Sequence, residues 1–461
     1  MKTLIDPADA LGPGLARVRE EFQVPAGFPP AVLAAAEIAA QRTPTEHVDR
    51  TDRAFVTLDP ATSIDLDQAF AVEPAGADLL LHYAIADVAW FVRDGDALDV
   101  EAWRRGETLY LPDGKAPLYP PQLSEAAASL LPTGPRAAVI FTVRVAPDGI
   151  TTLAGAERAL IRSRAKLAYD SVAAADLPAG FAELTTRVLA AEQARGAARV
   201  DPPQQDVERT ADGYTLAFAP RLPSEDRNAA LSLATNLAVA AALQAHGTGL
   251  FRVMPPPDAR AVARLRHTAA ALGLVWPAEQ PLEKFGQTLD AGDPKHAAFM
   301  LSVRRAGQGA TYAPFRAGET PWHAAVAATY CHATAPLRRL ADRYVVQAAL
   351  AVANGLAVPD EVTAAFDRLP PVMARSDALA GRINRAVVDL AEATMLAGQV
   401  GHTLAAVVID ADDGGARIQL REWAVVAHVN GHGFTPGQEV AVRLTAADPA
   451  KRLATFAAPT V

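Results

Sequence analysis

The amino-acid sequence predicts a multidomain α+β protein, because three patterns follow one another along its 461 residues. Helical periodicity between chain breakers fills residues 1–50, β-type runs followed by helical periodicity fill residues 51–397, and short alternating runs between turns fill residues 398–461. Half of the residues are hydrophobic, which is enough to bury more than one core. The expected parts are a small helical module, a central mixed sheet with helices, and a C-terminal OB-type β-barrel.

Two short helices are expected in the N-terminal part, over residues 8–22 and 30–42. The segment between them, residues 25–30, reads Pro-Ala-Gly-Phe-Pro-Pro and interrupts the helical pattern. Two helices separated by such a break predict a small helical module.

The central part begins with β-type runs, of which residues 79–86 and 137–145 are the clearest. After residue 228 the pattern becomes helical, and the apolar periodicity is strongest over residues 259–272 and 337–352. This change of period within one part predicts a mixed sheet covered by helices.

The tail alternates short apolar runs with the turn segments at residues 410–415 and 435–437. Five short strands in such a segment are what a small OB-type barrel requires, and that fold offers a groove for single-stranded nucleic acid. The candidate groove residues are Arg417, Arg421, Trp423, His428 and Arg443. Trp423 is equally suited to the barrel core.

A formal net charge of −9 argues against a protein that coats nucleic acid nonspecifically, because that mode of binding requires a basic surface. It does not exclude a nucleic-acid enzyme with an acidic active site. The single cysteine, Cys331, excludes an internal disulfide, and residues 1–6 lack the pattern of a signal peptide, so a cytoplasmic monomer is expected. The apolar stretch at residues 229–243 contains Asn236 and is too short to span a membrane, so it is expected to be a buried helix.

Three acids, Asp59, Asp65 and Asp67, lie within nine residues directly after the apolar run at residues 55–58. In an apolar setting such carboxylates repel one another unless hard divalent cations neutralise them. Paired Mg²⁺ or Mn²⁺ ions are the usual device for in-line attack on a phosphodiester. The alternative, a solvated Asp-rich turn, stays open on these residues alone.

A second candidate site is the expected helix start within residues 330–342. Thr334 suits a helix cap and Pro336 suits the first turn, so free N–H groups and the positive end of the helix dipole would meet at one point. Arg338 and Arg339 stand in the same turn. The combination predicts a phosphate receptor, and the alternative is an ordinary solvated helix start.

In content and order, these two sites resemble the ribonuclease II and ribonuclease R family, the RNB exoribonucleases. The acid motif of that family is similar to Asp59 and residues 65–69, and its Thr-Ser-Pro-Ile-Arg-Arg-Tyr helix start is similar to residues 334–340. Further matches lie, in order, at residues 82–88, 109–112, 129–132 and 161–169. The resemblance covers residues 54–397 of the chain and identifies the central part as an RNB-type catalytic domain. The tail is similar to the RNA-binding OB domain of family members.

The resemblance implies processive 3′-to-5′ hydrolysis of single-stranded RNA to nucleoside 5′-monophosphates, with Mg²⁺ or Mn²⁺ as cofactor. The implied catalytic residues are Asp59, Asp65, Asp67 and Arg338. The implied metal ligands are Asp59, Asp65, Asp67 and Gln68. The implied RNA contacts are Tyr110, Tyr169, Arg338, Arg339 and Arg382. Judged from its Leu-Tyr-Leu strand alone, Tyr110 would be assigned to the core.

Several positions depart from the family pattern. Gln68 replaces the fourth aspartate, which removes one negative charge from the expected metal site. Ala335 replaces the motif serine, and the paired glutamates of the family fall near Ala229 and Ala230. These changes motivate a rival hypothesis, in which the protein is a catalytically weakened RNA-binding factor.

Two further departures concern the C-terminal helix and the N-terminus. Val388 stands where the family has an acid, but its neighbour Asp389 shares a helical face with Arg382 and Arg385, so a shifted ion pair could substitute for the missing acid. Residues 1–50 are too few for the two cold-shock barrels that family members usually carry ahead of the catalytic domain. The helical pattern there favours a small helix-turn-helix-like module, which would either grip RNA or only cap the entrance of the channel.

Overall fold

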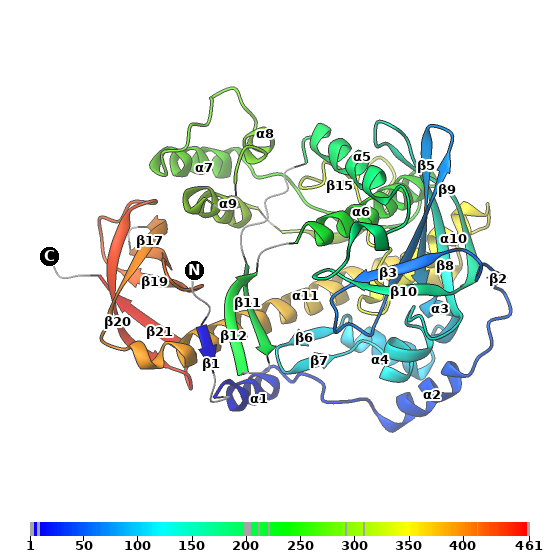
Figure 1. Ribbon diagram of the computed structural model, residues 1–461, viewed down its shortest axis with the longest axis horizontal. Helices are drawn as coiled ribbons and strands as arrows, with labels where there is room; N and C mark the ends of the chain where they lie inside the picture. The colour runs from blue at the N-terminus through cyan, green and yellow to red at the C-terminus, as the bar shows by residue number, and fades with distance from the viewer. Residues whose placement is uncertain are drawn as a thin grey trace.

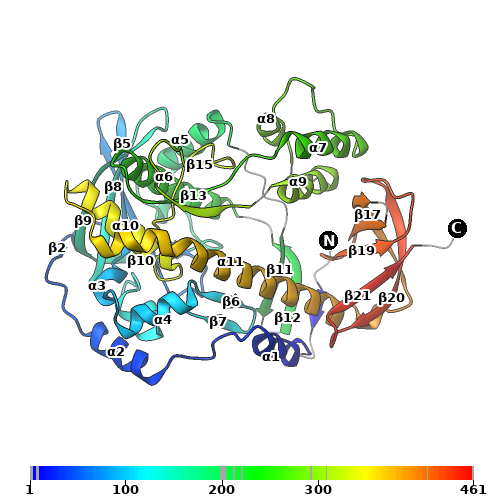
Figure 2. The ribbon, with the colours of Figure 1, turned by 180° about the vertical axis from the view of Figure 1, so that it is seen from behind.

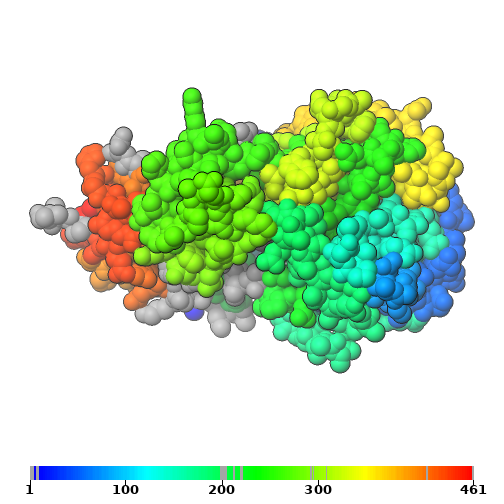
Figure 3. Space-filling view, turned by 90° about the horizontal axis from the view of Figure 1, so that it is seen from above, coloured from blue at the N-terminus to red at the C-terminus, as the bar shows by residue number. Residues whose placement is uncertain are grey.

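The computed structural model describes residues 4–6, 10–197, 204–210, 213–219, 222–290, 293–307, 309–412 and 414–458. The molecule is elongated, with a large body of helices and strands at one end and the C-terminal barrel at the other (Figures 1 and 3). The long helix α11, Asp360–Met395, runs along the body toward the barrel (Figure 2). This helix therefore joins the two parts.

The other α-helices are α1 Leu11–Glu21, α2 Pro30–Ala40, α3 Val88–Phe91, α4 Ala97–Arg105, α5 Phe181–Ala194, α6 Pro223–Ala245, α7 Ala259–Ala271, α8 Leu282–Gly286, α9 Pro294–Ala306 and α10 Leu340–Ala353. Shorter helical turns lie at Leu123–Ala127, Ala174–Asp176 and Ala397–Gln399. The strands of the body are β1 Leu4–Asp6, β2 Val48–Asp49, β3 Phe55–Asp59, β4 Gln68–Ala75, β5 Asp78–Ala86, β6 Leu109–Leu111, β7 Gly114–Ala116, β8 Arg136–Val145, β9 Thr151–Ile161, β10 Ser163–Ala168, β11 Gln204–Thr210, β12 Gly213–Ala219, β13 Leu250–Val253, β14 Thr311–Pro314, β15 Trp322–His323 and β16 Ala328–Thr329. The strands of the barrel are β17 Thr403–Asp412, β18 Gly415–Leu420, β19 Val426–Asn430, β20 Glu439–Asp448 and β21 Leu453–Ala457.

The body is built on a seven-stranded sheet with the order β10-β3-β4-β5-β8-β9-β2. Neighbouring strands are antiparallel except for the parallel pairs β10–β3 and β9–β2. Helices α5 and α6 pack against β8, and α6 and α10 pack against β9. Because β3 lies between β10 and β4, the acids that follow it emerge at one end of the sheet, between Tyr169 after β10 and Gln68 at the start of β4.

Helix α6 is the one helix of the described residues that is long and apolar enough to cross a membrane by length and composition. It lies in the core of the body, where Leu231, Ala234 and Val239 are fully buried. Its buried Asn236 accepts a hydrogen bond from the backbone N–H of Ala333 at 2.9 Å. The expectation of a buried helix is confirmed for this segment.

The two N-terminal helices form at the expected places, and they pack against different parts of the molecule. Helix α1 packs against α11 and contributes Leu11, Leu15 and Val18 to the hydrophobic cluster shared with the barrel. Helix α2 packs against α4 and contributes Val32 and Ala36 to the cluster of the body. The two helices are therefore divided between two hydrophobic clusters, and the helix-turn-helix-like role of residues 1–50 stays a prediction. The apolar faces of the two helices are covered by different partners and not by each other (Figure 2).

The tail forms a closed barrel with the order β17-β18-β19-β21-β20, in which β19 and β21 are parallel. This is the five-stranded OB-type architecture that the sequence predicts. The barrel docks onto α11 through Glu392, whose carboxylate accepts hydrogen bonds from Gln205 Nε2 at 2.6 Å and Val426 N at 3.1 Å. One buried side chain thus ties α11, β11 and the barrel together.

Candidate active site

The first acid, Asp59, ends strand β3, and its backbone carbonyl accepts a hydrogen bond from Tyr169 N at 3.2 Å. Its Oδ2 atom is buried and has no hydrogen-bond partner among the described residues. Burial raises the pKa of this carboxyl to about 6; Asp65 adds to the rise, and the cations Arg338 and Lys166 oppose it. A buried carboxylate oxygen without a partner is costly in the ionised state, which favours a bound cation there.

Asp67 connects the two motifs that lie far apart in the sequence. Its side chain is buried, and Oδ1 accepts a hydrogen bond from Leu337 N at 2.7 Å while Oδ2 lies 3.3 Å from Arg338 Nε. Burial raises the pKa of this carboxyl to about 7, although Arg338 and the Leu337 N–H favour the ionised form. Asp67 thus fixes the loop that carries Arg338 against the acid motif.

Asp65, in contrast, is already charge-compensated. Lys115 Nζ lies 2.9 Å from Asp65 Oδ1 and also 2.9 Å from Glu125 Oε1. The hydroxyl of Tyr110 donates to Asp65 Oδ2 at 3.3 Å. Tyr110 and Lys115 are Cα partners across the β6–β7 hairpin, so the hairpin presents an aromatic ring and an ammonium group to the same carboxylate.

Gln68, the neutral residue at the fourth acid position, has its own partner. Its Oε1 accepts a hydrogen bond from the hydroxyl of the buried Tyr83 at 2.7 Å. This oxygen keeps a second lone pair, but the hydrogen bond from Tyr83 fixes its position against strand β5. This geometry gives Gln68 a role in anchoring β4 to β5 as well as its expected place near the cation.

The metal ligands expected from the sequence, Asp59, Asp65, Asp67 and Gln68, stay a prediction, and their surroundings differ from one another. No group of three or more His, Cys, Asp or Glu side chains within them is arranged to hold a metal ion together. Asp67 is bound to the Arg338 loop, whereas Asp59 carries the partnerless oxygen and feels the charge of Asp65.

The second motif is a loop and not the start of a helix. Helix α10 begins at Leu340, and the N–H groups of Thr334 and Ala335 donate to Asp342 Oδ2 at 3.0 and 2.8 Å. The predicted helix cap at Thr334, with free N–H groups aimed at a phosphate, is therefore wrong. The buried carboxylate of Asp342 draws these N–H groups inward, and Asp67 takes the N–H of Leu337.

The two arginines of this loop have different environments. The Arg338 side chain is 46% exposed and faces the acids, where its Nε–H meets Asp67. Arg339 forms a bidentate pair with Asp342, with Nε–Oδ1 at 2.9 Å and Nη2–Oδ2 at 2.8 Å. Arg339 is therefore engaged in holding the loop, and Arg338 is the arginine that the structure leaves facing solvent at the acids.

The aromatic candidates also separate. Tyr110 is 55% exposed on β6, so its ring is not part of the core. Tyr169 is half-buried, its hydroxyl accepts a hydrogen bond from Asn228 Nδ2 at 2.8 Å, and the same amide nitrogen donates to Leu58 O at 3.1 Å. Tyr169 lies beside Asp59 through its backbone, while Tyr110 reaches Asp65 through its hydroxyl. The acids thus lie between two tyrosines.

Arg382 lies away from this group, on α11 beside α1. Its guanidinium carbon is 5.9 Å from the centre of the Phe22 ring. Asp389 further along α11 is half-buried, and burial raises the pKa of its carboxyl against the opposing charges of Arg385, Arg452 and Arg417. Within the described residues no ion pair joins Asp389 to Arg382 or Arg385, so the shifted ion pair is not formed and the arginines act on this carboxyl only through their charge at longer range.

In the barrel, Arg417 and His428 are exposed Cα partners across β18 and β19. Arg421 forms an ion pair with Glu439, and Arg443 Nε donates to Gly401 O at 3.3 Å. Trp423 is half-buried and packs against the barrel cluster. Of the predicted groove residues, Arg417 and His428 share the face of strands two and three of the barrel, which is the usual binding face of an OB fold.

Sequence reasoning missed Lys115, Asn228 and Asp342. The Leu-Tyr-Leu run followed by a Gly-containing turn signals a hairpin, and that pattern could have paired Lys115 with Tyr110. Nothing in the sequence signals the roles of Asn228 and Asp342. Asn228 donates to the backbone of Leu58 on β3, 170 residues away, and Asp342 accepts from backbone N–H groups, which carry no sequence signal.

Comparisons with known proteins identify the family of this chain. The family described as the RNB domain matches residues 47–353, and the RNase II-type exonuclease C-terminal S1 domain matches residues 402–458. Ribonuclease R of Aquifex aeolicus (strain VF5) is 26% identical over 440 residues, which cover 87% of this chain and 61% of the relative. The chain therefore spans about three fifths of the length of that curated relative.

Two solved structures are similar in fold. Mycoplasma genitalium RNase R in complex with ribose methylated single-stranded RNA has a TM-score of 0.87 at 19% identity, covering 98% of this chain and 78% of that one. Yeast Ssd1, a pseudonuclease, has a TM-score of 0.69 at 16% identity, covering 97% of this chain and 58% of that one. At these identities the similarity establishes the shared fold, and the fold accommodates a protein described as a nuclease and one described as a pseudonuclease.

Proposed function

The chain belongs to the RNB family, and from this premise we propose that it is a 3′-to-5′ exoribonuclease that hydrolyses single-stranded RNA to nucleoside 5′-monophosphates with the help of Mg²⁺ or Mn²⁺. The observation that carries the proposal is the contact of Asp67 with both Leu337 N and Arg338 Nε, because it brings a buried acid motif and a phosphate-binding guanidinium to one point. The proposal includes action in the cytoplasm as a monomer. Cys331 is buried and forms no disulfide, which is compatible with a reducing compartment.

The residues around the acids divide the proposed work. Asp59 and Asp65 would hold the divalent cation, which supplies charge neutralisation at the phosphate and lowers the pKa of a water molecule. Arg338 donates one N–H to Asp67 and has no other hydrogen bond to the described side chains, so its guanidinium can fork onto phosphate oxygens. Asp67 positions that guanidinium by binding its loop.

Tyr110 offers the stacking surface for the last bases of the strand. Its ring is exposed while its hydroxyl is tied to Asp65, so the ring is held next to the expected cation. Stacking needs only the π-face of a base, which makes the contact tolerant of sequence. Because the Tyr110 hydroxyl is hydrogen-bonded to Asp65, stacking of a base on Tyr110 would also affect the position of Asp65, one of the proposed cation ligands.

A direct test follows a single-stranded RNA labelled at its 5′ end, and the DNA of the same sequence, with Mg²⁺ or with EDTA on a gel. We expect the RNA to shorten stepwise from its 3′ end, with mononucleotides as products, and EDTA to stop the reaction. The Asp59→Asn variant should lose activity, whereas Asp52→Asn, an exposed acid just before β3, serves as the matched control. Internal cuts, or an unchanged band at high enzyme concentration, would overturn the proposal.

The second candidate, a catalytically weakened RNA-binding factor, is favoured by two contacts. Gln68 Oε1 is occupied by Tyr83, and Asp65 is paired with Lys115, so two of the expected ligands are engaged elsewhere. This candidate predicts RNA binding without shortening in either Mg²⁺ or Mn²⁺. The variants Gln68→Asp and Lys115→Met distinguish the two, because they add negative charge or free Asp65. Activity that appears only in these variants would establish the weakened factor.

A further inference from the structure

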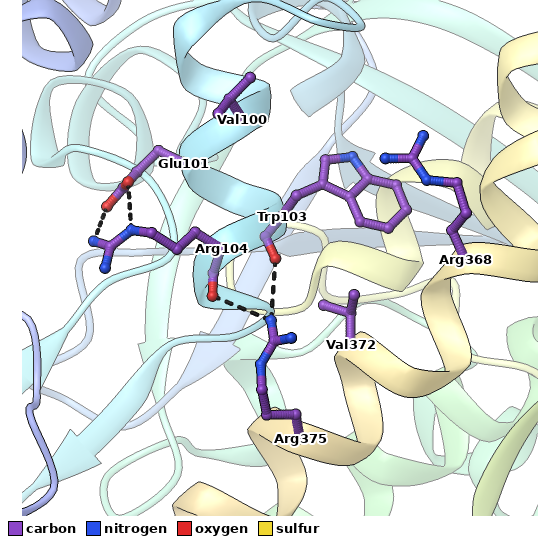
Figure 4. Close-up of a pocket in the computed structure, with 7 residues that line it drawn as sticks. All are labelled: Val100, Glu101, Trp103, Arg104, Arg368, Val372 and Arg375. Carbon is purple, nitrogen blue, oxygen red and sulfur yellow. Dashed lines mark hydrogen bonds and ion pairs between the residues drawn. The ribbon is translucent and has the colours of Figure 1, made fainter.

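A groove lies between helices α4 and α11, outside the group of candidate site residues. Its volume is about 690 Å³, and it is lined by Val100, Glu101, Trp103, Arg104, Arg368, Val372 and Arg375. The residues of α4 face those of α11 across the groove, and Trp103 projects toward the second helix (Figure 4). The two helices lie beside each other on the side of the molecule that Figure 2 presents.

The groove carries positive charge on a chain whose net charge is −9. Its one acid, Glu101, is neutralised by Arg104, at 2.8 and 2.6 Å, and by Arg105 beside the groove, at 2.7 Å. Arg368 and Arg375 have no acidic partner among the described residues and are exposed. A local reversal of sign of this kind attracts a polyanion.

The floor of the groove is an aromatic ring held in place. The indole Nε1 of Trp103 donates to the hydroxyl of Tyr344 on α10 at 2.8 Å, so the ring cannot turn freely. The Arg368 guanidinium carbon lies 4.4 Å from the ring centre, and Val100 beside it is 62% exposed. A fixed indole, a guanidinium plane and an exposed aliphatic side chain together form a surface on which a base can stack.

Arg375 is positioned for a phosphate next to that surface. Its Nη2 makes long hydrogen bonds, 3.4 and 3.3 Å, to the carbonyls of Trp103 and Arg104 at the end of α4 (Figure 4). These contacts orient the guanidinium and leave its other N–H groups toward the groove. An arginine held in this way presents a planar fork to a phosphate at little entropic cost.

We infer that this groove is a second binding site for single-stranded RNA, in which a base stacks on the Arg368 guanidinium, itself supported by the Trp103 ring, and the charges of Arg368 and Arg375 neutralise the adjacent phosphates. The occupant is a segment of a strand and not a free nucleotide. The groove is open and offers few contacts to a ligand. RNA will therefore bind there with measurable affinity only when other nucleotides of the same strand are bound elsewhere on the protein. The inference rests on the proposed function for the identity of the polymer.

The test compares the full-length protein with the double variant Arg368→Gln and Arg375→Gln, because glutamine keeps an amide donor for the carbonyls of Trp103 and Arg104. The control is Arg260→Gln with Arg264→Gln, two exposed arginines of α7 that remove the same charge. Binding is measured by fluorescence anisotropy in EDTA, with a labelled strand of about 30 nucleotides and with one of about 5, a length comparable to a single binding site. Both lengths are titrated at two salt concentrations.

We expect the groove variant to bind the long strand roughly three- to tenfold more weakly, with a salt dependence whose slope is smaller by about 1.4, as for two lost phosphate contacts. The short strand should bind as to the unaltered protein, and the control should match the unaltered protein at both lengths. Equal weakening by the control, weakening for the short strand, or no change for the long strand would each overturn the groove as an RNA site. Failure of the unaltered protein to bind RNA at all would instead reject the proposed function.

Discussion

Replacement of Glu392 by glutamine should stabilise the protein at alkaline pH, although it removes a charged group from a contact between α11, β11 and the barrel. The carboxylate is 6% exposed, and burial raises its pKa from 4.5 to about 7, against the hydrogen bonds from Gln205 and Val426 that favour ionisation. A rise of that size makes the ionised state about 3 kcal/mol less favourable in the folded protein, since one pKa unit corresponds to about 1.4 kcal/mol.

The direction of the pH effect follows from the raised pKa. The folded protein holds the proton of Glu392 more tightly than the unfolded chain does, so the stabilising contribution is complete below pH 4.5 and is lost as the pH rises through about 7. Glutamine keeps a carbonyl oxygen for the N–H groups of Gln205 and Val426 and never ionises. The variant should therefore match the unaltered protein in acid and exceed it in base.

Thermal unfolding followed by circular dichroism at about pH 5 and about pH 8.5, on either side of the folded pKa, measures this difference. We expect equal melting temperatures at the lower pH and a gain of a few degrees for Glu392→Gln at the higher pH, because each 1 kcal/mol shifts the midpoint of a large domain by about 2 °C. Glu279→Gln, at an exposed carboxyl, is the matched control and should show no such gain. A variant that is less stable at both pH values would refute the reasoning and show that the negative charge itself holds the barrel.

Three further predictions concern RNA. Asp67→Asn should nearly eliminate hydrolysis while RNA binding persists or tightens. The amide oxygen still accepts the hydrogen bond from Leu337 N, and the lost negative charge no longer repels the phosphates of the RNA. A parallel loss of hydrolysis and binding would show that Asp67 is structural. Tyr110→Ala should cost about 1–3 kcal/mol of stacking free energy and change the length of the final product. Tyr110→Phe keeps the ring and loses only the hydrogen bond to Asp65. A final product of unchanged length with the alanine variant would exclude stacking of the RNA on Tyr110. Arg417→Gln with His428→Gln should weaken binding of long RNA and flatten its salt dependence while short oligomers are still hydrolysed, and equal binding at two salt concentrations would contradict a role for that face.

The sequence predicted the elements of this fold well where the pattern is local. The alternating runs of the tail gave a closed five-stranded barrel, and the helical periodicity of residues 259–272 appears as α7, Ala259–Ala271. Local patterns succeed because the period of apolar residues decides which backbone form can bury them. The same reasoning predicted the two N-terminal helices but not their partners, since an apolar face does not specify which surface will cover it.

The candidate site shows the same division. The sequence by itself placed acids after a buried strand and arginines in the first turn of an expected helix, and the spacing of both motifs identified the family. Only the tertiary structure decided that Asp67 ties the two motifs together, that Asp65 is paired with Lys115, and that the arginine loop is not a helix start. The physical reason is that a buried carboxylate must be hydrogen-bonded, and its partners come from any segment that the fold brings next to it, however distant in the sequence. That return is a property of the packing of the whole body and not of the neighbouring residues.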